Sequence, residues 1–430
     1  MSAVDQSYRP RCLDRRLSLF LRAFGAVLIE GPKWCGKTWM GRRHSSSAIY
    51  LDDPPTRLRS SLDPRGVLAG SRPTLIDEWQ DAPVLWDVAR RMVDESPSKG
   101  LFIFTGSASP AQSAVSHSGT GRFARLRLRP MSLFESGQSS GAVTLSGLLA
   151  GDPIEPVASD LDYQGIIKLI CRGGWPSSLG LDDDLAALAP QQYLEALANS
   201  DLPQPDRVRR DPDKVRALLR SLARHTSTSA NFDTVRADIA DQSELDSIPA
   251  KSTLWSYLAA LRGVFAVDDL PPWVYSLRSK SQLRMAPTRH LADPSLAAAA
   301  LSATPESLHQ DPQTTGLLFE SLVVRDLRVY AEAQGGSVAH YRDNKGLEAD
   351  AIVTSADGRW GAVEVKLGAG QLESAADNLR RLRRKLADEV RQPSFLAVVT
   401  ATSGLAHTRD DGVHVVPIDC LGPGPAADQG

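Results

Sequence analysis

The sequence contains the stretch Gly31-Pro32-Lys33-Trp34-Cys35-Gly36-Lys37-Thr38. An apolar run at residues 25–29 precedes it and is typical of a buried strand, while residues 39–43 can continue as a helix. A strand, the pattern G-x-x-x-x-G-K-[ST] and a helix, in this order, form the phosphate-binding P-loop. The alternative is a chance glycine-rich turn between a strand and a helix, but both flanks favour the P-loop.

The residue types of this loop suit the binding of a nucleoside triphosphate. Gly31 and Gly36 allow backbone N–H groups to curl around an anion, and the start of the following helix adds a partial positive charge. Lys37 can reach the β- and γ-phosphates, and the Thr38 hydroxyl can hold Mg²⁺. The predicted ATP-binding residues are Gly31, Pro32, Lys33, Trp34, Cys35, Gly36, Lys37, Thr38 and Trp39.

Two acids follow a second apolar run downstream of the loop. Residues 74–76 read as a strand, and Asp77 and Glu78 come directly after them. We expect Asp77 to bind Mg²⁺, directly or through water, and Glu78 to polarise the attacking water. An apolar run that ends in acids is a weak signal by itself, because many strands end in a solvated turn. After a P-loop it predicts the pair of acids that hydrolysis needs.

A third apolar run, at residues 101–105, also ends in polar residues. Thr105 and Ser107 are candidate sensors of the γ-phosphate, although a hydroxyl at a strand end is otherwise ordinary. The next apolar and basic residues, 123–128, alternate and predict a strand with one basic face. Arg122 is either part of a solvated edge strand or an arginine finger that stabilises charge on the transferred phosphoryl group.

Length and composition restrict the class of protein. The chain has 430 residues, which predicts two or three domains, and a net charge of −2, so nucleic acid would have to bind at local basic patches. The four cysteines form no C-x-x-C pair, which argues against a zinc site and against a disulfide framework. No run approaches the roughly eighteen apolar residues of a membrane span. We therefore expect a cytoplasmic protein without a membrane partner.

The predicted fold class is α/β, and the chain is predicted to divide into four parts, of which the first is a P-loop NTPase (AAA+-like) domain. Residues 1–135 alternate between apolar runs and helical patterns, which predicts a mostly parallel sheet covered by helices. Residues 136–205 form a linker and a helical lid, because composition shifts to Gly, Ser and Pro after Ser136. Residues 206–290 read as three helices and a strand hairpin, a winged-helix-like layout in which residues 263–268 form a strand.

The winged-helix-like part has few cations where DNA would be read. The helix in the reading position offers only Lys251 and Arg262. A structural or lid module is therefore as consistent with the pattern as a DNA-binding one.

A second chemical site is predicted in residues 291–430. Glu320 lies among apolar neighbours of a helix, and two strands downstream are joined by Asp357-Gly358, a hairpin signal. Asp350, Glu364 and Lys366 have the arrangement of the PD-(D/E)xK nuclease core, with Glu364 and Lys366 on one face of their strand. Residues 291–430 are therefore predicted to form a restriction-endonuclease-like α/β domain. The acids could hold a second Mg²⁺ or Mn²⁺, and Lys366 could activate water.

Other interpretations of this second site remain open. The acids could face solvent on an ordinary alternating strand, and retained cleavage activity is a separate question from the fold. A basic helix at residues 379–386 could face DNA or could be a solvated surface.

Taken together, the chain resembles the AAA+-like bacterial and archaeal ATPases with an N-terminal AAA domain of the AAA_14 type and a C-terminal DUF4143 domain. The resemblance spans nearly the whole chain and implies ATP binding and hydrolysis, with Arg122 near a nucleotide, either its own or that of a neighbouring subunit. One departure is Ala351, where the family often has an aromatic residue. The resemblance rests on Tyr8-x-Pro10-Arg11, Gly31 to Thr38, Asp77-Glu78-Trp79-Gln80, Thr105-Gly106-Ser107, Gly121-Arg122, Pro130-Met131-Ser132-Leu133-x-Glu135, Phe319-Glu320, Asp350 and Glu364-Val365-Lys366.

The functional expectation is a Mg²⁺-dependent ATPase that couples hydrolysis to DNA binding, translocation or remodelling, and that acts as a homo-oligomer. One alternative is an ATP-dependent regulatory switch that binds a protein partner. Another is a metal-dependent nuclease regulated by the ATPase.

Overall fold

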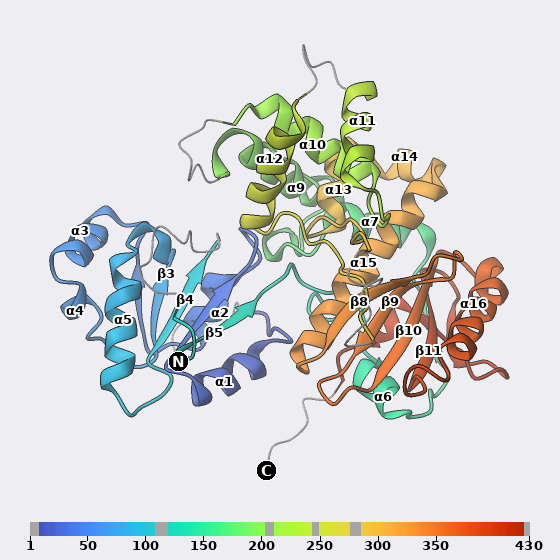
Figure 1. Ribbon diagram of the computed structural model, residues 1–430, viewed down its shortest axis with the longest axis horizontal. Coiled ribbons are helices and arrows are strands. Elements are labelled where there is room, and N and C mark those ends of the chain that lie inside the picture. The colour runs from blue at the N-terminus through green and yellow to red at the C-terminus, as the bar shows by residue number, and fades with distance from the viewer. Residues whose placement is uncertain (1–7, 108–118, 203–209, 243–248, 276–284, 425–430) are drawn as a thin grey trace. The chain divides into compact units, whose positions relative to one another are not determined.

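A computed structural model describes residues 8–107, 119–202, 210–242, 249–275 and 285–424. The chain divides into two compact units. The first runs to Pro130 and also includes Ala260–Ala266, and the second contains most of the remainder. Figure 1 labels helices and strands of both units.

The first unit is built on a parallel sheet. Among its described residues the strand order is β2-β3-β4-β1-β5, and every neighbouring pair is parallel. The strands are β1 (Ala26–Glu30), β2 (Ser47–Tyr50), β3 (Thr74–Asp77), β4 (Phe102–Gly106) and β5 (Phe123–Arg127). The helices are α1 (Asp14–Ala23), α2 (Lys37–Arg43), α3 (Pro54–Leu62), α4 (Pro64–Val67) and α5 (Val84–Glu95).

Both faces of this sheet are covered by helices. Phe102 and Phe104 of β4 join the hydrophobic core that contains Trp86 of α5. Ile103 and Thr105 alternate with them and therefore face the other side, where α2 packs so closely that a Cβ on Gly41 would lie 3.2 Å from Thr105 Cγ2. The prediction of a parallel, helix-covered sheet is confirmed, and the first unit is a P-loop NTPase-like fold.

The second unit contains a mixed sheet. Its order among the described residues is β7-β12-β13-β11-β10-β9-β8. A short parallel pair, β6 and β14, lies apart from this sheet. The strands are β6 (Val143–Thr144), β7 (Val157–Ala158), β8 (Ser337–Arg342), β9 (Glu348–Thr354), β10 (Trp360–Lys366), β11 (Phe395–Thr400), β12 (Leu405–Thr408), β13 (His414–Pro417) and β14 (Leu421–Gly422).

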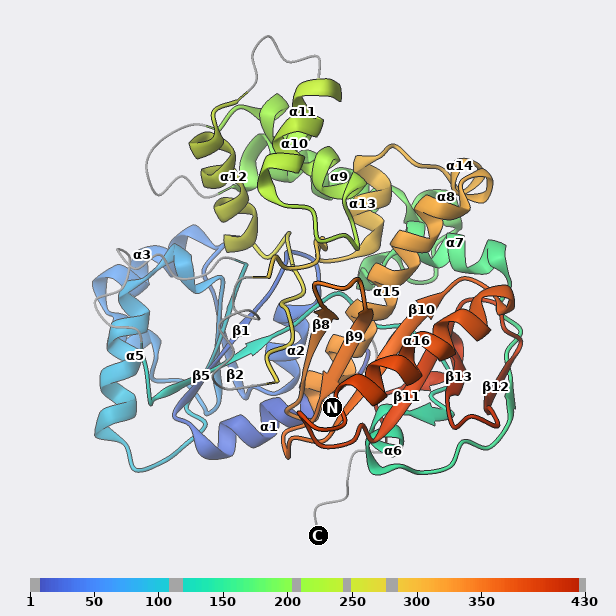
Figure 2. The ribbon, with the colours of Figure 1, turned by 45° about the vertical axis from the view of Figure 1, so that its right-hand side comes forward.

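Helices make up the rest of the second unit. The long helix α15 (Pro312–Ala333) packs against β8, β9 and β10, and α16 (Leu372–Lys385) packs against β9, β10 and β11 (Figure 2). The other helices are α6 (Leu145–Ala150), α7 (Tyr163–Arg172), α8 (Asp183–Ala186), α9 (Leu188–Ala196), α10 (Pro212–Arg224), α11 (Phe232–Gln242), α13 (Pro294–Ala300) and α14 (Pro305–Gln310). Helix α12 (Lys251–Gly263) begins in the second unit and ends in residues assigned to the first.

The central strands of this mixed sheet are buried on both faces. Leu379 and Leu382 of α16 share a core with Ile352 and Ala362. Side chains that alternate with these along the same strands, such as Val363, are buried as well. Cover on both sides explains why β9 and β10 read as nearly continuous apolar runs. The hairpin predicted at Asp357-Gly358 is confirmed by the antiparallel pairing of β9 and β10.

Two local expectations were wrong. The segment rich in Gly, Ser and Pro after Ser136 is part of the second unit rather than a free linker, because β6 pairs with β14 and β7 pairs with β12. Residues 263–268 do not form a strand: α12 continues to Gly263, and only isolated bridges link Val267 with Leu291 and Leu270 with Thr288. Part of the predicted winged-helix-like region, 203–209, 243–248 and 276–284, lies outside the described residues.

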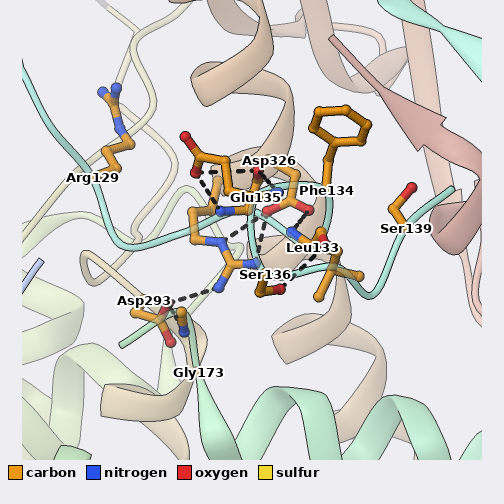
Figure 3. A network of polar contacts seen from close by, with 12 residues as sticks. Arg129, Leu133, Phe134, Glu135, Ser136, Ser139, Gly173, Asp293 and Asp326 are labelled. Carbon is orange, nitrogen blue, oxygen red and sulfur yellow. Dashed lines mark hydrogen bonds and ion pairs between the residues drawn. The ribbon is translucent and has the colours of Figure 1, made fainter. Parts of the chain in front are cut away.

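A buried ionic network holds the start of the second unit together (Figure 3). The Arg325 guanidinium donates to Asp293 Oδ2 at 2.7 Å and to Asp326 Oδ1 at 2.7 Å, and all three side chains are buried. Asp326 accepts the Leu133 N–H at 2.9 Å, and Asp293 accepts the Gly174 N–H at 3.0 Å. The acids therefore fix backbone groups as well as the buried cation, which anchors the chain soon after it enters this unit.

Candidate functional site

The P-loop joins the end of β1 to α2. A Cβ on Gly31 would lie 2.1 Å from the Leu128 carbonyl oxygen, so only glycine fits beside the neighbouring chain. Gly36, which precedes α2, has φ +99°, a conformation that favours glycine. Trp34 adopts φ +63°, which is uncommon for a residue with a side chain. The loop is thus held in a specific curled conformation.

Lys37 and Thr38 lie at the start of α2. Lys37 is 5% exposed, and its Nζ donates to the Pro32 carbonyl at 2.7 Å, so the ammonium bridges the two ends of the loop. The Thr38 hydroxyl donates to Asp77 Oδ1 at 2.9 Å. This contact brings the end of β3 to the loop, as the sequence predicts.

The acids at the end of β3 have different surroundings. Asp77 is buried and also accepts a hydrogen bond from the Thr105 hydroxyl of β4. Burial raises the pKa of Asp77, while the hydroxyls of Thr105 and Thr38 oppose the shift. Hydroxyl and carboxylate oxygens are the ligands that Mg²⁺ prefers, so Thr38 and Asp77 fit a magnesium site.

Glu78 is the first residue after β3 and is turned by a left-handed backbone, φ +52°. Its Oε2 accepts hydrogen bonds from Gln80 Nε2 and, at 3.4 Å, from the Ser107 hydroxyl. The structure therefore brings Lys37, Thr38, Asp77, Glu78 and the polar end of β4 to one edge of the sheet. Thr105 contacts Asp77, whereas Ser107 contacts Glu78.

Two further residues that the sequence assigns to the ATP site, Arg122 and Trp39, have partly exposed side chains. Arg122 directly precedes the edge strand β5, and its Nε donates to Asp94 at 2.5 Å on the surface. Among the contacts of the described residues, none links Arg122 to the P-loop. Trp39 follows Thr38 on α2 and is 46% exposed.

Two residues near the loop escaped assignment of a role from the sequence. Gln80 contacts Glu78, and Arg11 donates to the Cys35 carbonyl at 2.7 Å. Gln80 is only two residues from Glu78, so a contact between the two side chains could have been inferred from the sequence. The Arg11 contact links residues from separate elements and has no local pattern.

Comparison with family models agrees with this geometry. Residues 23–136 match the model described as an AAA domain, AAA_14. Residues 315–421 match a domain of unknown function, DUF4143, and residues 163–307 match another, DUF8612. The chain carries an AAA domain at its N-terminus and a DUF4143 domain at its C-terminus. The AAA domain contains the P-loop and is an ATPase domain.

The chain is also similar to individual proteins. An uncharacterised protein of Mycobacterium tuberculosis and one of Mycobacterium bovis are each 27% identical over 287 residues, which is 65% of this chain. The match spans 57% of the length of each of these relatives.

The chain also has likeness to two solved structures. A Walker-type ATPase of Pyrococcus abyssi aligns with 13% identity and a TM-score of 0.38, over 67% of this chain and 94% of that one. The RuvB Holliday junction branch migration motor of Thermotoga maritima aligns with 17% identity and a TM-score of 0.28, over 61% and 93% of the two chains.

In the DUF4143 domain the predicted acids form a cluster. Lys366 Nζ lies 2.7 Å from Glu364 Oε2 and 3.6 Å from Asp350 Oδ2, and Glu364 Oε1 accepts from Asn378 of α16 at 2.6 Å. Burial, and next the charge of Asp350, raises the pKa of Glu364 to about 7. Burial, and next the charge of Asp350, raise the pKa of Glu320 in α15 well above its usual value.

Lys366 is the cation of this cluster. Burial opposes its charge, but Asp350 and Glu364 outweigh burial and raise the pKa of Lys366. Within the described residues, no group of three or more His, Cys, Asp or Glu side chains has the spacing to hold a metal ion. The cluster is thus built as acids around a lysine.

Cations elsewhere in the second unit are mostly paired. In α12, Lys251 is 2.7 Å from Asp233. In α16, Arg380 pairs with Asp377 and Lys385 pairs with Asp343.

Of the helices in the described ranges, none is both long and apolar enough to cross a membrane.

Proposed function

We propose that this chain is a Mg²⁺-dependent ATPase that couples ATP hydrolysis to the binding, translocation or remodelling of DNA. The AAA domain supplies hydrolysis. The observation that carries the DNA part of the proposal is a basic surface on α16, next to the acidic cluster of the DUF4143 domain.

In the proposed ATP site each group has one task. The loop N–H groups and Lys37 bind the phosphates, and Thr38 and Asp77 hold Mg²⁺. Glu78 accepts a proton from the attacking water through its carboxylate, which Gln80 and Ser107 orient. Thr105 and Ser107, at the end of β4, respond to the γ-phosphate. Trp39, which follows Thr38 on α2 and is exposed, is proposed to contact the nucleotide as well.

Arg122 is proposed to complete the site of a neighbouring subunit in a homo-oligomer. Its side chain is 42% exposed and pairs with Asp94 at the surface rather than with a residue of its own P-loop, so another copy of the chain can reach it. Arg122→Ala should bind ATP and lose turnover, and mixing it with Lys37→Ala protein should restore part of the activity, because a mixed interface combines an intact loop with an intact arginine. If no mixture exceeds the sum of its parts, the arginine does not act between subunits.

The basic surface of α16 consists of Arg381 and Arg384. Both are exposed, they are one helical turn apart, and among the described residues no acid forms an ion pair with either of them. Asn378, on the same helix, binds Glu364 of the cluster. A helix that presents such guanidinium groups is suited to contact phosphates of a nucleic-acid backbone.

Salt-dependent DNA binding tests this proposal. Wild-type protein should bind duplex or single-stranded DNA with an affinity that falls as salt rises, because cations on the protein release counterions from the phosphates. The double variant Arg381→Gln/Arg384→Gln should bind more weakly and with a shallower salt dependence. The slope of the logarithm of the binding constant against the logarithm of the salt concentration should become shallower by about one unit for each phosphate that the variant no longer neutralises.

The control removes two exposed arginines from the first unit, Arg15→Gln/Arg59→Gln. It should bind DNA as the wild type does. Equal binding by the α16 variant would remove this surface from the proposal. No DNA binding by the wild type at low salt would favour the alternative, a regulatory switch that binds a protein.

A metal-dependent nuclease is the second candidate function. It is favoured by the contacts of Lys366 Nζ, which lies 2.7 Å from Glu364 and 3.6 Å from Asp350 and so brings two acids and a cation together on the neighbouring strands β9 and β10. Glu320 of α15 is a third acid whose pKa is raised by the charge of Asp350 as well as by burial. In this candidate the acids hold Mg²⁺ or Mn²⁺ after Lys366 moves away, and Lys366 orients water.

This candidate predicts that Asp350→Asn and Glu364→Gln each abolish Mn²⁺-dependent nicking of plasmid DNA while ATP turnover is unchanged. Each change keeps the shape of the side chain and removes a charge that the metal needs. Lys366→Met should keep metal binding and lose cleavage. Uncut DNA with the wild-type full chain, and equal Mn²⁺ binding by wild type, Glu364→Gln and the exposed control Glu389→Gln, would reject the metal site.

A further inference from the structure

Arg11 is a buried arginine that joins two distant parts of the first unit. It directly precedes the turn into α1 and is 6% exposed. One terminal nitrogen donates to the Cys35 carbonyl at 2.7 Å, and the other donates to the Arg129 carbonyl, also at 2.7 Å. Hydrogen bonds from a charged donor are among the stronger ones in proteins, so both backbone carbonyls are held firmly.

The bond to Cys35 determines how one peptide group of the P-loop is turned. In a planar trans peptide, the C=O of one residue and the N–H of the next point in opposite directions. The Cys35 carbonyl points toward Arg11, so the Gly36 N–H points away from Arg11. Gly36, at φ +99°, has no side chain that would resist this orientation.

The bond to Arg129 ties the loop to the chain that follows β5. This segment already supports the loop, because the Leu128 N–H donates to the Glu30 carbonyl at 2.8 Å and the Leu128 carbonyl lies 3.5 Å from Cys35 Sγ. The same carbonyl is the atom that excludes a Cβ on Gly31. Residues 128–129 and the Arg11 guanidinium therefore both support the P-loop, and Arg11 links this segment to the loop.

We propose that Arg11 is a positioning residue of the nucleotide site, which turns the Gly36 N–H toward the phosphates of ATP and holds it there. The inference rests on the proposed function in one respect, that this loop binds ATP. Without Arg11 the Cys35 carbonyl loses its donor in a buried place, and the peptide between Cys35 and Gly36 can rotate to find another partner. The phosphate would then lose one fixed donor.

The expected result is a change in ATP binding rather than in the chemical step. In Arg11→Ala protein the Kd for a fluorescent ATP analogue and the KM for ATP should rise by about tenfold or more, the size of a lost hydrogen bond to a charged group. The kcat at saturating ATP should stay within about threefold of wild type, since Asp77 and Glu78 belong to another strand. Arg9→Ala, an exposed arginine two residues earlier, should match wild type in both quantities.

A role in stability alone would give a different pattern. Partial unfolding lowers the active fraction, and thus kcat, without raising KM. If Arg11→Ala does not fold, Arg11→Gln, which keeps one amide donor, should fold and show a smaller rise in KM in the same direction. ATP affinity and KM equal to wild type in a folded Arg11 variant, or a fall in kcat at constant KM, would overturn the proposal.

Lys37→Ala separates this inference from the function on which it rests. If Lys37→Ala abolishes ATP binding while the Arg11 variants bind normally, the loop binds ATP and only the role of Arg11 is wrong. If Lys37→Ala also binds ATP normally, the nucleotide site itself is wrongly placed.

Discussion

Glu78→Gln protein is expected to bind ATP with wild-type affinity and to hydrolyse it about 10²- to 10⁴-fold more slowly, the usual contribution of a general base. The amide has the shape of the carboxylate, and Glu78 has no contact with the P-loop among the described residues, so binding should be preserved. The proton of the attacking water, however, would lose its acceptor. Phosphate release at saturating ATP and Mg²⁺ measures the turnover, and a fluorescent ATP analogue measures binding.

Glu155→Gln is the matched control, because Glu155 is exposed and belongs to the second unit. It should leave turnover unchanged. Equal turnover in the wild type and in Glu78→Gln would remove Glu78 from the chemical step. Loss of ATP binding in Glu78→Gln would mean that this carboxylate has a part in nucleotide binding instead.

Lys37→Ala is expected to weaken ATP binding by about 30-fold or more, because a buried ammonium that bonds charged phosphate oxygens is worth about 2 kcal/mol or more. The side chain lies inside the loop, where its Nζ contacts the Pro32 carbonyl, so the ammonium is already placed between the two ends of the loop. Titration with the ATP analogue gives the affinity directly.

The control for this change is Arg42→Ala, an exposed cation on the same helix. It should bind ATP as the wild type does, which would show that the total charge of α2 is not the cause. Near-normal ATP affinity in folded Lys37→Ala protein would contradict the assignment of the loop.

Much of the first unit could be predicted because its signals are local. The P-loop pattern specifies a strand before it and a helix after it, and β1 and α2 lie there. The acids at the end of the second apolar run had to lie near the loop, since the carboxyl ends of parallel strands share one edge of a sheet. The contact between Thr38 and Asp77 is the result.

Other features depend on partners that are distant in sequence. Arg11 bonds a carbonyl 118 positions away, and no pattern around Arg11 indicates that partner. Ser159 bonds Asp419, 260 positions away, and β7 pairs with β12 nearby. The composition of residues 136–160 describes only local chain flexibility, so it predicted a linker where long-range pairing makes an ordered part of the second unit.

The contacts within the acidic cluster of the DUF4143 domain could be predicted from the sequence only in part. The spacing of Asp350, Glu364 and Lys366 predicted that they lie together, and the structure places Lys366 Nζ 3.6 Å from Asp350 and 2.7 Å from Glu364. It did not indicate that Lys366 would contact both acids, nor that Asn378 would hold the second oxygen of Glu364. These contacts depend on how α16 packs on the sheet, which the period of a single strand does not specify.

The coupling of hydrolysis to DNA is tested most directly by ATP turnover measured with and without DNA, under conditions of saturating ATP and low salt. We expect single-stranded, duplex or branched DNA to raise the turnover of the wild type. Arg381→Gln/Arg384→Gln protein should respond less, and its turnover without DNA should be normal. If every form of DNA leaves the turnover of the wild type unchanged, ATP hydrolysis is not coupled to DNA.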